Sequence, residues 1–250
     1  MTASRDKTKY IPGMYATRRP GAAELAERYM REREIRRRQK KSAKAKLTIP
    51  PTICFSRKIG VGALEVADIL AEKIGYRVFD RQILEEIAKK AKLSEKTVGF
   101  FDEIYPGKMS ELLAMIFGEK SFIKSDYSRH LFSAVLSLAH IEPTIFVGRG
   151  THLILPRDRI LAVRFIGGRS HRINRLSKIL KVDKTEADGK INEIDKEQKD
   201  FFKKVYGKKE ATPYEFDMVI NFDYISSPKW AADIVETAFK AKFGKEIKAG

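Results

Sequence analysis

The sequence predicts an α/β protein in which helices cover both faces of a mainly parallel sheet of five strands. Short apolar runs of strand length alternate with longer amphipathic runs from residue 49 onward. The apolar runs contain few polar residues, as expected for strands that are buried on both faces. The chain has 250 residues and a hydrophobic share of 43%, which is enough for one large domain with a sizeable core.

The five expected strands are short apolar runs bounded by glycine or polar residues. They lie at 49–56, 76–80, 143–150, 159–167 and 216–223. Helical segments separate most of them, and this alternation makes parallel pairing with right-handed crossovers the expected arrangement.

Amphipathic helices are expected between and after these strands. They lie at 62–75, 81–92, 170–180, 185–206 and 228–244, and residues 109–141 contain two further helical stretches that form an inserted helical region. Ser94 would cap one more helix, and Asp183 or Thr185 would begin the long helix. Pro228 and Gly244 mark the expected ends of the last one.

Residues 1–48 differ in composition from the rest and are expected to form a basic, partly helical or disordered N-terminal arm before one domain at 49–250. The arm holds 15 Lys and Arg against 5 Asp and Glu, so it carries +10 of the total charge of +17. This asymmetry favours a nucleic acid, a membrane surface or another polyanion as a partner. A charged tail that only keeps the protein in solution fits the composition equally well.

Cysteine usage and hydropathy indicate the compartment. Cys54 is the only cysteine, which excludes internal disulfides and fits a reducing environment. No apolar run approaches the roughly 20 residues needed to span a bilayer, and the N-terminus lacks the apolar segment of a secretory signal. We therefore expect a cytoplasmic protein without a membrane span. The four histidines show no paired spacing, so no metal site is predicted.

Three of the expected strands end in glycines or charged residues, and ligands of such sheets bind at the carboxyl ends of the strands. The run SRKIGVG (56–62) lies before a helix, where glycines allow backbone amides to approach a phosphate. FDR (79–81) and VGRG (147–150) place arginines at two further strand ends. Because a guanidinium can bind a phosphate with two parallel hydrogen bonds, the three ends predict an anion-binding cleft.

Five segments in register resemble the cytidylate-kinase-like family. The first, TICFSRKIGVG with the following helix, YRVFDR and the DE pair at 102–103, resembles the opening of the family. The others are PTIFVGRGTHLIL, RSHRINRL, DKEQKDFF and YEFDMVINFDYIS. The resemblance implies a three-layer P-loop kinase fold with a helical insertion and a lid. It also implies phosphoryl transfer from ATP to a nucleoside monophosphate, CMP or dCMP, with Mg²⁺.

The resemblance implies roles for particular residues of this sequence. The ATP-binding loop would comprise Ser56, Gly60, Val61, Gly62, Ala63 and Leu64. The acceptor nucleotide would contact Asp80, Arg81, Arg149 and Arg169, although Asp80 is equally explained as a helix cap. The catalytic cations would be Arg57, Lys58, Arg172 and Lys196.

The chain also departs from the family pattern. Ala63 and Leu64 stand where a P-loop has a lysine and a hydroxyl, Val61 replaces a serine, and Gln198 stands at the expected lid arginine. Phosphoryl transfer depends almost wholly on positioned charge. Two functions therefore stay open: a cytidylate-kinase-like enzyme with weak activity, or a catalytically degenerate regulatory module that binds nucleotide or nucleic acid.

Overall fold

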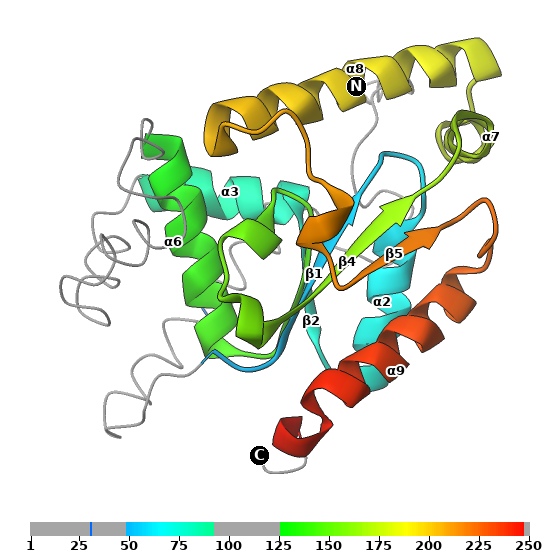
Figure 1. Cartoon of the computed structure of the whole chain (residues 1–250). Coiled ribbons are helices and arrows are strands. Elements are labelled where there is room, and N and C mark those ends of the chain that lie inside the picture. The colour runs from blue at the N-terminus through cyan, green and yellow to red at the C-terminus, as the bar shows by residue number, and fades with distance from the viewer. Residues whose placement is uncertain (1–30, 32–48, 93–125, 248–250) are drawn as a thin grey trace.

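The computed structural model describes residue 31 and residues 49–92 and 126–247, which Figure 1 draws as coloured ribbon. The basic arm at 1–48 lies outside these residues except for Arg31, which is exposed and helical. The helix expected to begin at Ser94 and the first part of the inserted region also lie outside them.

The sheet confirms the predicted architecture. Its strands are β1 (Thr52–Arg57), β2 (Arg77–Asp80), β3 (Thr144–Val147), β4 (Ile160–Ile166) and β5 (Met218–Asn221). All pairs are parallel, and the strand order is β2-β3-β1-β4-β5. The strand that precedes the glycine-containing loop is therefore central, with the VGRG strand on one side and β4 on the other.

The sheet separates two layers of helices (Figure 1). On one face, α2 (Ala63–Ile74) and α9 (Pro228–Ile247) pack over apolar side chains such as Phe55 and Phe165. On the other face, α3 (Arg81–Lys92) and α6 (Asp126–Ile141) pack over apolar side chains such as Phe79. Strands β1 to β4 are mostly buried on both faces, which explains why their sequences are apolar almost throughout, whereas Val219 of the edge strand β5 is exposed.

Two more helices complete the described part of the chain. α7 (Arg169–Leu180) and α8 (Lys184–Tyr206) pack on each other through a separate apolar cluster that includes Ile59 of the loop after β1. α8 crosses the carboxyl edge of the sheet, above the strand ends (Figure 1). Short 3₁₀ helices lie at Thr151–Leu153, Arg157–Arg159 and Pro213–Glu215.

The structure confirms the predicted caps of two helices and contradicts the predicted end of a third. Asp80 caps α3, since its Oδ1 accepts a hydrogen bond of 2.9 Å from the Ile83 amide. Asp183 rather than Thr185 caps α8, accepting one of 2.8 Å from the Glu186 amide. The predicted end of α9 at Gly244 is wrong, because the helix continues to Ile247. A glycine weakens a helix interior without ending it.

The third strand is shorter than predicted. The sequence indicated 143–150, but β3 ends at Val147 because Gly148, Arg149 and Gly150 all have positive φ. Extended pairing cannot continue through three left-handed residues. Within the described residues, no helix is long and apolar enough to cross a membrane.

Candidate functional site

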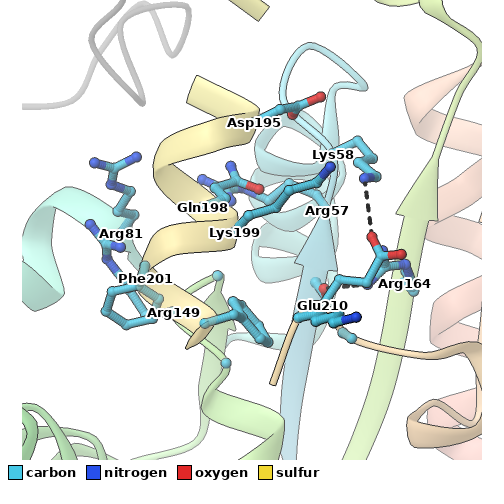
Figure 2. A pocket seen from close by; sticks show the side chains of 16 residues that line it. Arg57, Lys58, Arg81, Arg149, Arg164, Asp195, Gln198, Lys199, Phe201 and Glu210 are labelled. Atoms are coloured by element: carbon cyan, nitrogen blue, oxygen red, sulfur yellow. Dashed lines mark hydrogen bonds and ion pairs between the residues drawn. The ribbon is translucent and has the colours of Figure 1, made fainter. Parts of the chain in front are cut away.

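A pocket lies at the carboxyl edge of the sheet, where β1, β3 and β4 end beneath α8 (Figure 2). Its lining contains more cations than carboxylates. The charged side chains that line it are Arg57, Lys58, Arg81, Arg149, Arg164, Lys199 and Lys209, against Asp195 and Glu210. Such an excess of positive charge in a concave site favours an anionic ligand.

The VGRG turn after β3 forms the floor of this pocket. The Gly148 amide donates to the Phe55 carbonyl at 2.8 Å, which joins the turn to β1. Arg149 has a φ of 54°, rare for a residue with a side chain, and the Tyr206 hydroxyl donates to its carbonyl at 2.6 Å. A Cβ on Gly150 would lie 2.5 Å from the Tyr206 ring, so only glycine fits there.

Arg149 is a buried cation with a lowered affinity for its proton. Its guanidinium lies 4.1 Å from the centre of the Phe201 ring and is paired with Glu85 of α3. Burial, followed by the nearby charge of Arg81, lowers the pKa of Arg149 to about 9. Its Nε is buried without a hydrogen-bond partner among the described residues. The side chain therefore retains capacity for an anionic ligand.

Arg81 stands next to Arg149 and shares its two carboxylates. Its Nε donates to Glu85 at 3.0 Å, and its Nη2 is paired with Glu197 of α8. Glu197 also lies 3.8 Å from Arg149. Two arginines from different elements thus converge on the same carboxylate oxygens, and a guanidinium binds carboxylate and phosphate groups through the same paired hydrogen bonds.

The end of β1 supplies further cations. The Arg57 guanidinium packs on Gly148, where an added Cβ would lie 3.1 Å from its Nη1. Lys58 lies 3.7 Å from Glu210, which lines the same pocket. Ser56 accepts a hydrogen bond of 3.4 Å from Arg164 of β4. The structure thus brings together the predicted residues Ser56, Arg57 and Lys58 with Arg81 and Arg149.

Sequence reasoning missed Arg164 as a pocket residue. The signal was a single cation inside the apolar run ILAVRFI of β4. Because β4 pairs with β1 so that Arg164 stands opposite Ser56, the side chain comes to the pocket from the neighbouring strand. Strand order places it there, and strand order is not readable from the position of one arginine.

The loop between β1 and α2 contains glycines with left-handed backbone but lacks the lysine and hydroxyl side chains of a P-loop. Gly60 and Gly62 have φ values of 83° and 92°. Ala63 and Leu64, at the positions of the P-loop lysine and hydroxyl, are buried in the core between the sheet and α2. The Arg175 guanidinium lies against Gly62, where an added Cβ would be 3.1 Å from its Cζ.

Several residues predicted for the site lie outside the pocket lining. They are Gly60, Val61, Gly62, Ala63, Leu64, Asp80, Arg169, Arg172 and Lys196. The Arg172 side chain donates to the Ile59 carbonyl at 2.7 Å and to both oxygens of Asp195 at 2.8 Å. It therefore joins α7 to α8 and to the loop after β1. Arg169 is exposed and paired with Asp188, while Lys196 is exposed on α8.

The residues present do not fit Mg²⁺ bound in the manner of a P-loop. Leu64 offers no hydroxyl, and Asp195 is engaged by Arg172. Within the part of the chain that the structure describes, no group of three His, Cys, Asp or Glu side chains could hold a metal ion. The histidines there do not ligate as a group, and His152 instead contacts Glu215 at 3.2 Å.

A central strand, a glycine turn and a following helix, in a parallel sheet with cations at its carboxyl edge, are features of a three-layer α/β protein with a P-loop kinase-like fold. The sequence profile of the Cytidylate kinase-like family matches residues 52–224. The chain belongs to this family, which supports a kinase-like function. No curated protein sequence matches the chain.

A solved structure shares this fold. An uncharacterized protein from Eubacterium ventriosum ATCC 27560 is 19% identical with a TM-score of 0.59, over 78% of this chain and 99% of that one. Shikimate kinase from Bacteroides thetaiotaomicron (12% identity, TM-score 0.39) covers 76% of this chain and 96% of its own. Dephospho-CoA kinase from Campylobacter jejuni (14% identity, TM-score 0.35) covers 77% of this chain and 98% of its own.

Proposed function

We propose that this protein is a cytoplasmic, cytidylate-kinase-like phosphotransferase whose acceptor is a nucleoside monophosphate, CMP or dCMP. The phosphate of the acceptor binds between Arg81 and Arg149. The observation that carries the proposal is the buried guanidinium of Arg149 at the end of β3, with its Nε unsatisfied among the described residues. A buried polar group without a partner is costly, so its position favours a ligand.

ATP is the proposed phosphoryl donor, and its site is weakened. The glycine turn before α2 can direct backbone amides at a phosphate, but Ala63 and Leu64 are buried and contribute neither charge nor hydroxyl. Arg57 and Lys58 are the cations that would compensate, because both line the pocket at the end of β1. Weak ATP affinity and slow turnover follow, since positioned charge dominates this chemistry.

The experiment is a calorimetric titration with CMP, dCMP and the other monophosphates, together with a coupled assay in ATP and Mg²⁺. Arg149→Ala should weaken monophosphate binding by roughly 1–3 kcal/mol, the range for a charged hydrogen-bond partner. Arg157→Ala removes an exposed arginine outside the pocket lining and should leave binding unchanged. Equal binding by the Arg149 variant and the unaltered protein would refute the acceptor site.

A second candidate function is a regulatory module that binds nucleotide or nucleic acid without turnover. Burial of Ala63 and Leu64 favours it, as does Gln198 in place of the expected lid arginine. The same two measurements separate the candidates. Monophosphate binding without product formation, at any ATP concentration, supports the module, and steady turnover supports the enzyme.

A further inference from the structure

Arg164 is a pocket cation to which the proposed function assigns no role. Its Nη1 donates to Ser56 Oγ at 3.4 Å, and its guanidinium lies 5.6 Å from the centre of the Phe216 ring. The side chain is half-buried, and burial lowers its pKa. An otherwise apolar strand thus directs one guanidinium into the pocket.

Within the described residues, Arg164 forms no ion pair with a carboxylate. Glu210 and Glu215 act on its charge from a greater distance, and both have other cations as partners. Glu210 lies 3.7 Å from Lys58, and Glu215 lies 3.1 Å from Lys208. Because a half-buried charge without a close counter-ion is unfavourable, the position favours an anionic ligand.

The cations of the pocket fall into two groups. Figure 2 shows Arg81 and Arg149 on one side, and Lys58 and Arg164 on the opposite side of the labelled cluster. The first group is paired with Glu85 and Glu197, whereas in the second group Lys58 lies 3.7 Å from Glu210 and Arg164 has no ion pair among the described residues.

We propose that Arg164 and Lys58 form a second anion subsite, which binds another phosphate group while Arg81 and Arg149 bind the first. This rests on the proposed function, which assigns the first phosphate to the arginine pair. The ligand of the complete pocket carries two phosphate groups, from one polyphosphate chain or from a nucleotide and a separate phosphate compound. Arg164 supplies charge that Ala63 does not.

The test is calorimetry on the full chain at one fixed salt concentration, with CMP, tripolyphosphate, and inorganic phosphate added to CMP-saturated protein. Arg164→Gln should lower tripolyphosphate affinity about tenfold, as for loss of one charged hydrogen-bond partner, and leave CMP affinity within about twofold. If the second phosphate comes from a separate molecule, the loss falls instead on phosphate binding to the CMP-saturated protein.

Two variants keep this test decisive if Arg164→Gln is poorly folded. Lys58→Gln alters a partly exposed side chain and should reproduce the selective loss. Lys178→Gln removes one charge from the exposed face of α7, outside the pocket lining, and should change nothing.

The outcomes separate this inference from the proposed function. Unchanged tripolyphosphate and second-phosphate binding in both pocket variants would overturn the second subsite, and CMP binding that still depends on Arg149 would leave the acceptor site standing. If the unaltered protein binds none of CMP, tripolyphosphate and inorganic phosphate, both the second subsite and the acceptor site are overturned.

Discussion

Both the backbone conformation and the burial of Arg149 cost free energy. A left-handed backbone at a residue with a side chain costs roughly 1–3 kcal/mol, and the side chain is also buried as a cation. The Tyr206 hydroxyl and the flanking Gly148 and Gly150 hold this conformation. Strain of this kind persists where the surrounding structure fixes it, and it is concentrated at functional sites. The turn thus holds the Arg149 side chain in the lining of the pocket.

Glu197 of α8 interacts with both Arg81 and Arg149. Its carboxylate should therefore compete with a phosphate for the two guanidinium groups. Replacing it by glutamine removes the negative charge that Arg81 and Arg149 share. Because the carboxylate is about half exposed, with 49% side-chain exposure, the expected gain in CMP affinity is modest, roughly two- to fivefold. Glu193→Gln, on the exposed face of α8 beside Lys190, should leave affinity unchanged. Weaker CMP binding by Glu197→Gln would mean that the carboxylate supports the site.

At the residue scale, the sequence predicted residues of the pocket lining only where neighbouring residues in the chain indicated them. Glycines around Arg149 and the polar end of the first strand were visible in the sequence, and these residues meet in the pocket. Arg172 looked equally available, but its Nη2 donates to both oxygens of Asp195, 23 positions away. Arg164 was missed for the opposite reason, since its proximity to Ser56 depends on which strands pair.

Among the elements, α8 connects the pocket to the core. Its middle carries Asp195, Gln198 and Lys199 over the pocket, and its end inserts Tyr206 beneath the VGRG turn. Tyr206 is buried, stacks on Phe132 of α6 with ring centres 5.9 Å apart, and donates to the Arg149 carbonyl. Packing at the end of α8 is thus coupled to the conformation of the turn that carries the arginine.

This coupling predicts opposite effects for two glycine substitutions. Gly150→Ala places a Cβ 2.5 Å from the Tyr206 ring at a φ of 66°, so it should destabilise the protein by at least about 1–3 kcal/mol. Gly189→Ala, inside α8 with no atom within 4 Å of the added Cβ, should stabilise it by about 0.5–1 kcal/mol. Urea unfolding of both variants measures the difference. Equal stabilities would contradict the packing described for the turn.

Element positions were predictable because periodicity and end signals agree along most of the domain. The predicted strand at 159–167 is β4 at Ile160–Ile166, and the helix at 81–92 is α3 at Arg81–Lys92. The errors arose where a local signal was overridden. β3 stops early because three left-handed residues follow it, and α9 continues through Gly244 because a helix tolerates one glycine.

At the scale of the whole molecule, the described domain has its own core on both faces of the sheet. The first residue after the arm, Ile49, belongs to that core with 6% exposure, and its carbonyl accepts a hydrogen bond of 2.8 Å from Arg159. A cut between residues 48 and 49 keeps Ile49 and the rest of this core in the chain. The domain should remain folded without the arm, with an unchanged unfolding midpoint.

Nucleic-acid binding by the basic arm would separate the two candidate functions. Residues 1–48 carry +10, a charge that binding of a small nucleotide in the pocket does not require. Contacts between lysine or arginine and nucleic-acid phosphates release counterions, so binding should be unspecific in sequence and weaken steeply with salt. We expect the full chain to bind RNA or DNA at low salt and removal of residues 1–48 to abolish most of this binding.

Fluorescence anisotropy with a labelled single strand, measured over a salt series, tests this expectation. The truncated protein should retain the CMP affinity of the full chain, because the pocket lining begins at Ser56. That result would show that the arm and the pocket act on different ligands, which favours a module with an added polyanion-binding segment. Nucleic-acid binding that survives truncation would assign it to the domain, leave the arm as a charged tail, and strengthen the interpretation as an enzyme.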